Sequence, residues 1–149
     1  MVNECEKAPA FSLKDEEGKI VKLNNFKDKI LVLYFYPRDN TSGCTKEACN
    51  IRDNLSKLKN KNVEVLGVSN DHEESHKKFK NKHELNFPLL VDEDKEVSKK
   101  YGVYVKKNMY GREYFGLKRT TFIIEKGIIK KIIDKVKVGE HAEQILEII

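Results

Sequence analysis

The chain has 149 residues, of which 39% are hydrophobic and 36% are charged, and its formal net charge is +5. This length suits one domain over residues 1–149 that buries roughly two thirds of the surface of its unfolded chain. The longest apolar run is about a third of what a membrane-spanning helix needs, and the lysines alternate with acidic residues rather than forming a basic stripe. Because no apolar signal core precedes the domain, we expect a cytoplasmic protein with no membrane and no nucleic-acid partner.

The first half of the chain predicts a hairpin, a buried strand and an amphipathic helix. Segments 11–13 and 19–22 flank Asp15 to Gly18, where glycine allows the positive φ of a turn. Residues 30–36 are uninterrupted apolar and end at a proline, which is typical of a central strand covered on both faces. Residues 44 to about 59 carry four apolar side chains at helical spacing, namely Ala48, Ile51, Leu55 and Leu58.

The middle of the chain continues the alternation of strands and helices. We expect a strand over residues 63–69, a polar surface helix over 72–85 and a short strand over 88–91. A helix follows from about 95 to 101. Residues 103–118 carry no clear period and are predicted to be a long loop.

The last part of the chain predicts a second hairpin, with strands over 121–124 and 128–133 joined by a turn at 125–127, and then a helix over 140–149. The whole order favours an α/β protein with a mixed central sheet flanked by helices and an N-terminal β-hairpin. Right-handed crossovers leave few topologies, and a thioredoxin-like fold suits the closing hairpin and helix. Periodicity alone supports the α/β class and does not select that fold.

Cys44 stands where the buried strand gives way to the first long helix. The unpaired N–H groups and the positive dipole end of a helix N-terminus stabilise a thiolate. Cys44 also shares the stripe of Ala48 and Ile51, so a small buried hydrophobe is the other interpretation of this residue. The local pattern favours a reactive thiol and leaves an inert one open.

Cys49 follows Cys44 by five residues. On an α-helix this spacing places the two residues ~140° apart around the axis and ~7.5 Å apart along it. Their Cα atoms would then be ~8–9 Å apart, beyond the ~7 Å limit for a disulfide without backbone movement. The pair is therefore not a Cys-x-x-Cys site, and a disulfide between these residues would require the start of the helix to unwind.

Metal binding is the alternative use of two nearby cysteines. A structural zinc site needs four ligands, usually in two pairs. The remaining cysteine, Cys5, lies in a polar segment and is assigned no role. His72 and His76 belong to a separate polar helix, where their spacing of four is better explained as a solvated face. We therefore expect no metal and no cofactor.

The stretch Pro37-x-x-x-Thr41-x-x-Cys44 resembles the active-site signature of the peroxiredoxins. A second cysteine at position 49, followed by Arg52-Asp53, is similar to the bacterioferritin-comigratory, or Q-type, subfamily. The resemblance covers nearly the whole chain, with further matching segments at 8–13, 87–92 and 119–122. The family usually has a proline where this chain has Ser42, a change that frees the loop and removes no reactive group.

The resemblance implies a thioredoxin-like fold and a thiol peroxidase that reduces hydrogen peroxide and organic hydroperoxides. Cys44 would be the peroxidatic thiolate, and it would become a sulfenic acid. Cys49 would condense with that sulfenic acid to form an intramolecular disulfide, which thioredoxin would reduce. Since the disulfide closes within one chain, we expect a monomer.

The resemblance also implies roles around the thiol. Thr41 would hydrogen-bond the peroxide and the sulfur, and Pro37 would shape the pocket and shield it from water. Arg119 would supply a fixed positive charge for the thiolate and the departing oxygen. Glu47 would orient Arg119.

Two other functions stay open. A thioredoxin-like binding or chaperone protein with incidental cysteines would consume no peroxide and would not rearrange its helix on oxidation. A thiol–disulfide oxidoreductase is disfavoured because the chain contains no Cys-x-x-Cys. Consumption of peroxide by the reduced protein separates these functions from a peroxidase.

Overall fold

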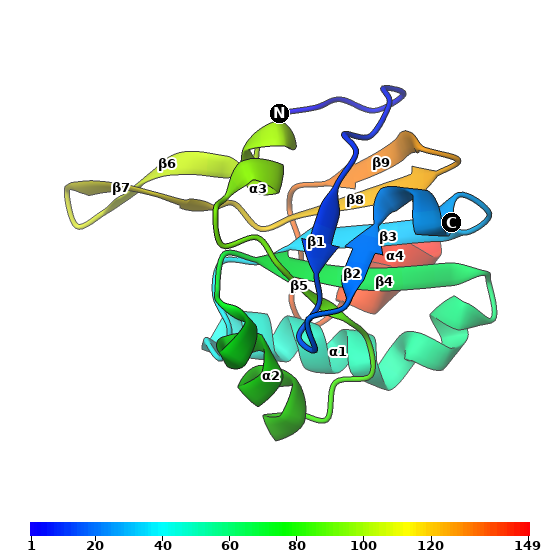
Figure 1. Ribbon diagram of the computed structural model, residues 1–149, viewed down its shortest axis with the longest axis horizontal. Coiled ribbons are helices and arrows are strands. Elements are labelled where there is room, and N and C mark those ends of the chain that lie inside the picture. Colours follow the sequence, from blue (N-terminus) through cyan, green and yellow to red (C-terminus); the bar gives the residue numbers. More distant parts are fainter.

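The computed structural model describes residues 1–149 as a thioredoxin-like α/β fold around one seven-stranded mixed sheet (Figure 1). The elements in chain order are β1 (Ser12–Lys14), β2 (Ile20–Lys22), η1 (Leu23–Phe26), β3 (Ile30–Phe35), α1 (Ser42–Lys59), β4 (Val63–Ser69), α2 (Glu73–Lys82), β5 (Leu89–Val91), α3 (Glu96–Lys100), β6 (Tyr104–Met109), β7 (Arg112–Leu117), β8 (Thr120–Glu125), β9 (Ile128–Ile133) and α4 (His141–Ile148). The strand order in the large sheet is β2-β1-β5-β4-β3-β8-β9, and the expected N-terminal hairpin is its β1–β2 edge.

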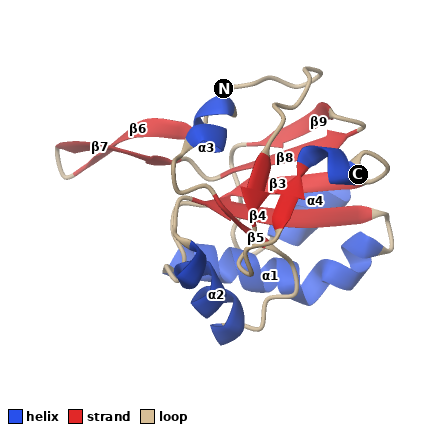
Figure 2. Ribbon diagram, in the orientation of Figure 1, coloured by secondary structure: helices blue, strands red, loops and turns tan.

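Strand β3 lies in the interior of the sheet, parallel to β4 on one side and antiparallel to β8 on the other. Successive side chains of a strand point to opposite faces. The even-numbered apolar residues from Val32 to Tyr36 therefore join the core beneath α1, α2 and α4, and the odd-numbered ones join the core on the face of α3. Figure 2 shows the helices on both sides of the sheet. The two-sided burial predicted from the uninterrupted apolar run is confirmed.

Helix α1 buries the predicted stripe and begins two residues before Cys44. Its N-cap, Thr41, has extended backbone angles (φ −84°, ψ 158°), so the chain turns sharply from the end of β3 into the first turn. The apolar stripe packs on the sheet, where Ala48 and Ile51 are fully buried. Packing of this face holds the helix on the sheet, in one core cluster with residues of β3 and β4.

Residues 103–118 form a hairpin rather than the predicted long loop. Strands β6 and β7 pair with each other as a separate two-stranded sheet that projects from the body of the molecule (Figure 1). Their side chains are mostly exposed on both faces, so the sequence carries no alternation of apolar and polar residues. The feature that specifies this hairpin is its turn at Tyr110 and Gly111. Both residues have positive φ (53° and 77°), as a two-residue hairpin turn requires.

Helix α2 differs from the predicted polar surface helix in one respect. His76 is fully buried, so the interpretation of its face as solvated is wrong. The sequence signal was the spacing of His76 and Phe79, which share one face and are both buried. None of the helices combines the length and the apolar character needed to cross a membrane.

Candidate active site

Cys44 is the third residue of α1 and is only 2% exposed, with a free thiol. Its side chain belongs to the core cluster beneath α1, as the interpretation of Cys44 as a small buried hydrophobic residue predicts. One polar group reaches the sulfur, because Nη2 of Arg119 donates a hydrogen bond to Sγ of Cys44 at 3.4 Å. A buried sulfur with a cationic donor is a setting for a thiolate rather than for an inert apolar side chain.

Sheet pairing brings Arg119 to Cys44 across the sequence. Arg119 lies between β7 and β8, and the next residue, Thr120, pairs with Phe35 at the end of β3. This register places the guanidinium beside the first turn of α1. Gly43 allows the close approach, since a Cβ at that position would lie 3.2 Å from Nη2 of Arg119.

Arg119 also contacts a buried carboxylate. Nη1 of Arg119 donates to Oε1 of Glu47 at 2.5 Å, and Glu47 is fully buried one helical turn after Cys44. Burial alone would lower the pKa of Arg119, but the negative charges of Glu47 and Cys44 outweigh it and raise this pKa. The guanidinium is therefore a permanent cation in a fixed orientation.

His141, which the sequence analysis did not single out, completes the cluster. Its Nδ1 lies 3.0 Å from Oε2 of Glu47 as a contact that lacks hydrogen-bond alignment, and its Nε2 shares a 2.8 Å hydrogen bond with Oγ1 of Thr121. His141 begins α4 and is fully buried. In the sequence, His141 stands out only as a histidine at the start of the last helix. That position does not predict which residues it contacts.

Tyr34 borders the same cluster from β3. Its ring meets the His141 ring edge-on at a centroid distance of 5.3 Å, and its hydroxyl is buried without a hydrogen-bond partner. Burial, with the nearby charges of Glu47 and Cys44, raises the pKa of Tyr34 well above its usual value. Tyr34 therefore stays protonated and contributes an apolar wall.

Thr41 and Pro37 lie on the loop that leads into α1. The Thr41 hydroxyl donates to the carbonyl oxygen of Arg38 at 3.0 Å and not to the sulfur of Cys44. Pro37 is half-buried at the end of β3. The structure thus joins Cys44, Arg119 and Glu47 by direct contacts and places Thr41 three residues away at the helix N-cap.

Cys49 is half-buried on the same helix, and its thiol is free. The segment between Cys44 and Cys49 is α-helical. The helical spacing that keeps the two cysteines too far apart for a disulfide is therefore present in the structure. Cys5 is exposed and lies outside the cluster. The arrangement can stabilise a sulfur anion, hold a second anionic oxygen beside Arg119 and exclude bulk water from the sulfur.

The chain matches the AhpC/TSA family over residues 5–132. It is 44% identical over 143 residues to the Peroxiredoxin Bcp of Bacillus subtilis, a match that covers 95% of this chain and 91% of the relative. It is 41% identical over 140 residues to the Peroxiredoxin Bcp of Escherichia coli, covering 93% of this chain and 90% of the relative.

Solved structures give the same result. The bacterioferritin comigratory protein of Xanthomonas campestris, described for its alkyl peroxide reduction activity, superposes with a TM-score of 0.87 at 34% identity and covers 92% of this chain and 88% of its own. A cysteine-to-serine mutant of PrxQ from Xylella fastidiosa superposes with a TM-score of 0.89 at 32% identity. The match covers 98% of this chain and 96% of the PrxQ chain.

Proposed function

This chain belongs to the AhpC/TSA family, as a peroxiredoxin of the bacterioferritin-comigratory, Q-type subfamily, and we propose that it reduces hydroperoxides through Cys44. The observation that carries this assignment is the 3.4 Å contact between Sγ of Cys44 and the guanidinium of Arg119. Neither an incidental cysteine nor a Cys-x-x-Cys oxidoreductase needs a half-buried cation fixed at that sulfur.

In the first step the Cys44 thiolate attacks one oxygen of hydrogen peroxide or an organic hydroperoxide. An S–O bond forms while the O–O bond breaks, and the other oxygen takes a proton and leaves as water or an alcohol. The sulfur is oxidised to a sulfenic acid and the peroxide is reduced. Arg119 donates to the sulfur, and from this position its charge would also stabilise the oxygen that departs.

Thr41 and Pro37 are proposed to shape the peroxide site. The Thr41 hydroxyl now contacts the carbonyl of Arg38, and a rotation about its χ1 would let it donate to a peroxide oxygen instead. Pro37 would limit the access of water to the sulfur from the end of β3. Glu47 would hold Arg119 in place.

In the second step the Cys49 thiol attacks the sulfenic sulfur of Cys44. A disulfide forms and water leaves, so no further oxidant is needed. Because an intact helix holds the Cα atoms ~8–9 Å apart, the first turns of α1 must open before the sulfurs can meet. A dithiol reductant then returns both cysteines to thiols, and we assign this role to thioredoxin. The cycle needs one chain and a compartment that reduces disulfides, which favours a cytoplasmic monomer.

The test is a stopped-flow measurement in which the fully reduced protein is mixed with hydrogen peroxide or an organic hydroperoxide. The proposed function predicts stoichiometric loss of peroxide, followed by turnover when thioredoxin and its reductase are added. A protein that binds partners but consumes no peroxide would be a thioredoxin-fold binding protein. Reduction of protein disulfides without peroxide consumption would indicate the oxidoreductase.

A further inference from the structure

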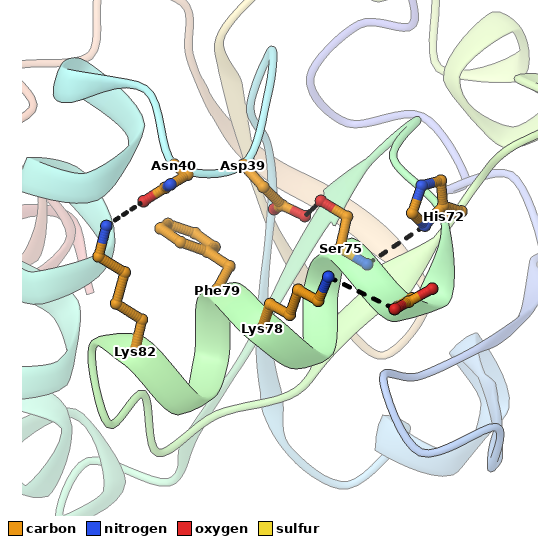
Figure 3. A pocket seen from close by; sticks show the side chains of 8 residues that line it. Asp39, Asn40, His72, Ser75, Lys78, Phe79 and Lys82 are labelled. Atoms are coloured by element: carbon orange, nitrogen blue, oxygen red, sulfur yellow. Dashed lines mark hydrogen bonds and ion pairs between the residues drawn. The ribbon is translucent and has the colours of Figure 1, made fainter.

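A second buried polar cluster lies behind the loop that carries Thr41. Its centre is Asp39, which accepts three side-chain hydrogen bonds, from Oη of Tyr36 at 2.6 Å, Oγ of Ser75 at 2.8 Å and Nδ1 of His76 at 2.7 Å. Figure 3 shows Asp39 and Ser75 pointing toward one another across the pocket between the loop and α2. A carboxyl group that accepts three hydrogen bonds on its two oxygens is suited to the ionised form.

The second ring nitrogen of His76 meets another acceptor. Nε2 lies 2.7 Å from the backbone carbonyl oxygen of Leu90, and His76 is fully buried. A neutral imidazole carries only one N–H, whereas a carbonyl oxygen and a carboxylate can only accept. With Asp39 ionised, both short contacts are satisfied together only when both ring nitrogens carry hydrogen, so the geometry favours an imidazolium paired with a carboxylate.

The groups around His76 support this charge. Asp39 faces it from the loop before α1, Asp71 lies nearby in the loop before α2, and the Tyr36 ring lies 6.2 Å away between centroids. Burial alone would lower the pKa of His76, but the hydrogen bond and charge of Asp39, the Leu90 carbonyl and the charge of Asp71 outweigh it and raise this pKa. Tyr36 stays neutral, because burial and then Asp39 raise its pKa well above its usual value.

The same atoms could be taken for a metal site, since ligand atoms of Asp39, Asp71 and His76 lie within 4.8 Å of one another. Two ligands of a tetrahedral zinc ion are about 3.3 Å apart at the usual bond lengths of ~2.0–2.1 Å. The 2.7 Å between Nδ1 of His76 and Oδ2 of Asp39 is shorter and is the length of a charge-assisted hydrogen bond. The cluster is therefore a closed hydrogen-bond network.

The network also restrains the loop before α1. The backbone N–H of Asp39 donates to Oδ2 of Asp71 at 2.8 Å, and Asn40 adopts a positive φ of 61°. Thr41 comes next as the N-cap of α1. Asparagine adopts this left-handed conformation more readily than most residues, and here it turns the chain toward α1. Helix α2 thus holds this loop mainly through buried Asp39, with a longer, exposed hydrogen bond of 3.4 Å from Nζ of Lys82 to Oδ1 of Asn40 (Figure 3).

We propose that His76 is a buried imidazolium that acts as a positioning residue for the peroxide site, by holding Asp39 and through it the Thr41 loop. This inference rests on the proposed function of Cys44 and adds a pH dependence to it. When His76 loses its proton, one ring nitrogen presents a lone pair to an oxygen, and Asp39 is left buried without a cation. The loop then loosens, and peroxide is held less well in line with the sulfur.

The charge of His76 can be measured in the wild-type protein without any peroxide. Nitrogen-15 chemical shifts of the imidazole, followed across pH, report whether one or both ring nitrogens carry hydrogen. We expect both ring nitrogens of His76 to carry hydrogen at pH 7. A neutral His76 ring at pH 7 overturns the inference, whether or not Cys44 reacts with peroxide.

The positioning role is tested by the rate of reaction of Cys44 with hydrogen peroxide between pH 6 and pH 9 in wild-type, His76→Gln and Asp39→Asn proteins. We expect each substitution to slow the reaction about tenfold at pH 7 and the double variant to be no slower than either, since the two residues act as one pair. The wild-type rate should carry a falling inflection that both variants lack. Ser75→Ala, which removes only a neutral hydrogen bond to Asp39, should keep it.

The outcomes separate this inference from the proposed function. A protonated His76 together with identical pH profiles in wild type and His76→Gln would overturn the positioning role while leaving the peroxidase intact. If reduced wild-type protein consumed no peroxide at all, the proposed function and the role that rests on it would both fall, and the nitrogen shifts would still decide the charge. Should His76→Gln fold poorly, Asp39→Asn and the wild-type spectrum carry the test.

Discussion

One guanidinium joins the sulfur of Cys44 to the carboxylate of Glu47. Nη2 of Arg119 lies 3.4 Å from Sγ, and Nη1 lies 2.5 Å from Oε1 of the buried carboxylate. A single positive charge therefore contacts two acidic groups. One is the reactive thiol of Cys44, and the other is the carboxylate of Glu47, which holds the guanidinium in place. Because Glu47 is on the same helix as Cys44, packing of that helix sets the distance between the cation and the sulfur.

Arg119 is predicted to do more than stabilise the thiolate. Complete ionisation of an ordinary thiol raises its reactive fraction at pH 7 only about thirtyfold. Arg119→Ala should slow peroxide attack by more than that, since it also removes the charge at the leaving oxygen. The rate is measured by stopped flow beside a thiol titration, with Lys118→Ala as the control at an exposed neighbouring cation. An unchanged rate would make Arg119 an ordinary charge at the end of a strand.

Glu47→Gln should slow peroxide attack about tenfold, equivalent to about 1.4 kcal/mol of barrier. Glutamine keeps the shape of the side chain and removes the charge that orients Arg119. Glu143→Gln changes an exposed carboxylate of α4 and should leave the rate unaltered. Equal rates in the two variants would show that Arg119 holds its position without Glu47.

His76 should also contribute to the stability of the fold in a pH-dependent way. Its folded-state pKa is raised above the unfolded value of about 6.5, so its contribution is fully present below that pH and is lost as pH rises through the folded pKa. We expect the free energy of unfolding of His76→Gln to be lower than that of wild type at pH 6, and the difference to shrink toward pH 9. Urea titrations at both values measure it, and a difference that grew with pH would reverse the assigned charge.

Oxidation is predicted to open the start of α1. The disulfide between Cys44 and Cys49 cannot form on an intact helix, so amide exchange across residues 44–52 should rise in the oxidised protein and fall again on reduction. The opening should also make resolution slower than peroxide attack, which leaves a sulfenic acid that excess peroxide overoxidises. Cys49→Ser should show no such rise on peroxide treatment. Identical protection in both states, with the disulfide established by mass spectrometry, would refute the unwinding.

Local patterns in the sequence predict the elements that bury a face. Strand 63–69 coincides with β4, and the stripe that includes Ala48 and Ile51 is the packed face of α1. The hairpin of β6 and β7 escaped prediction because it buries little on either side and is specified by the Tyr110-Gly111 turn. A pattern of burial can only reveal elements that are buried.

The partners within the site depend on pairings between distant segments. The register of β8 on β3 brings Arg119 to Cys44, and only the family resemblance pointed to that arginine. No spacing in the chain indicates that His141 meets Glu47 or that His76 meets Asp39. Two helices bring the first pair together, and α2 and the loop before α1 bring the second pair together. Such contacts are determined by tertiary structure.

The central claim is that Cys44 is the only nucleophile toward peroxide. Reduced wild-type, Cys44→Ser and Cys5→Ser proteins are mixed with hydrogen peroxide in a stopped-flow instrument, and peroxide loss is followed over one turnover. Wild type and Cys5→Ser should consume one equivalent at the same rate, because Cys5 is exposed and lies outside the cluster around Arg119. Cys44→Ser should consume essentially none. Near-normal consumption by Cys44→Ser would contradict the account.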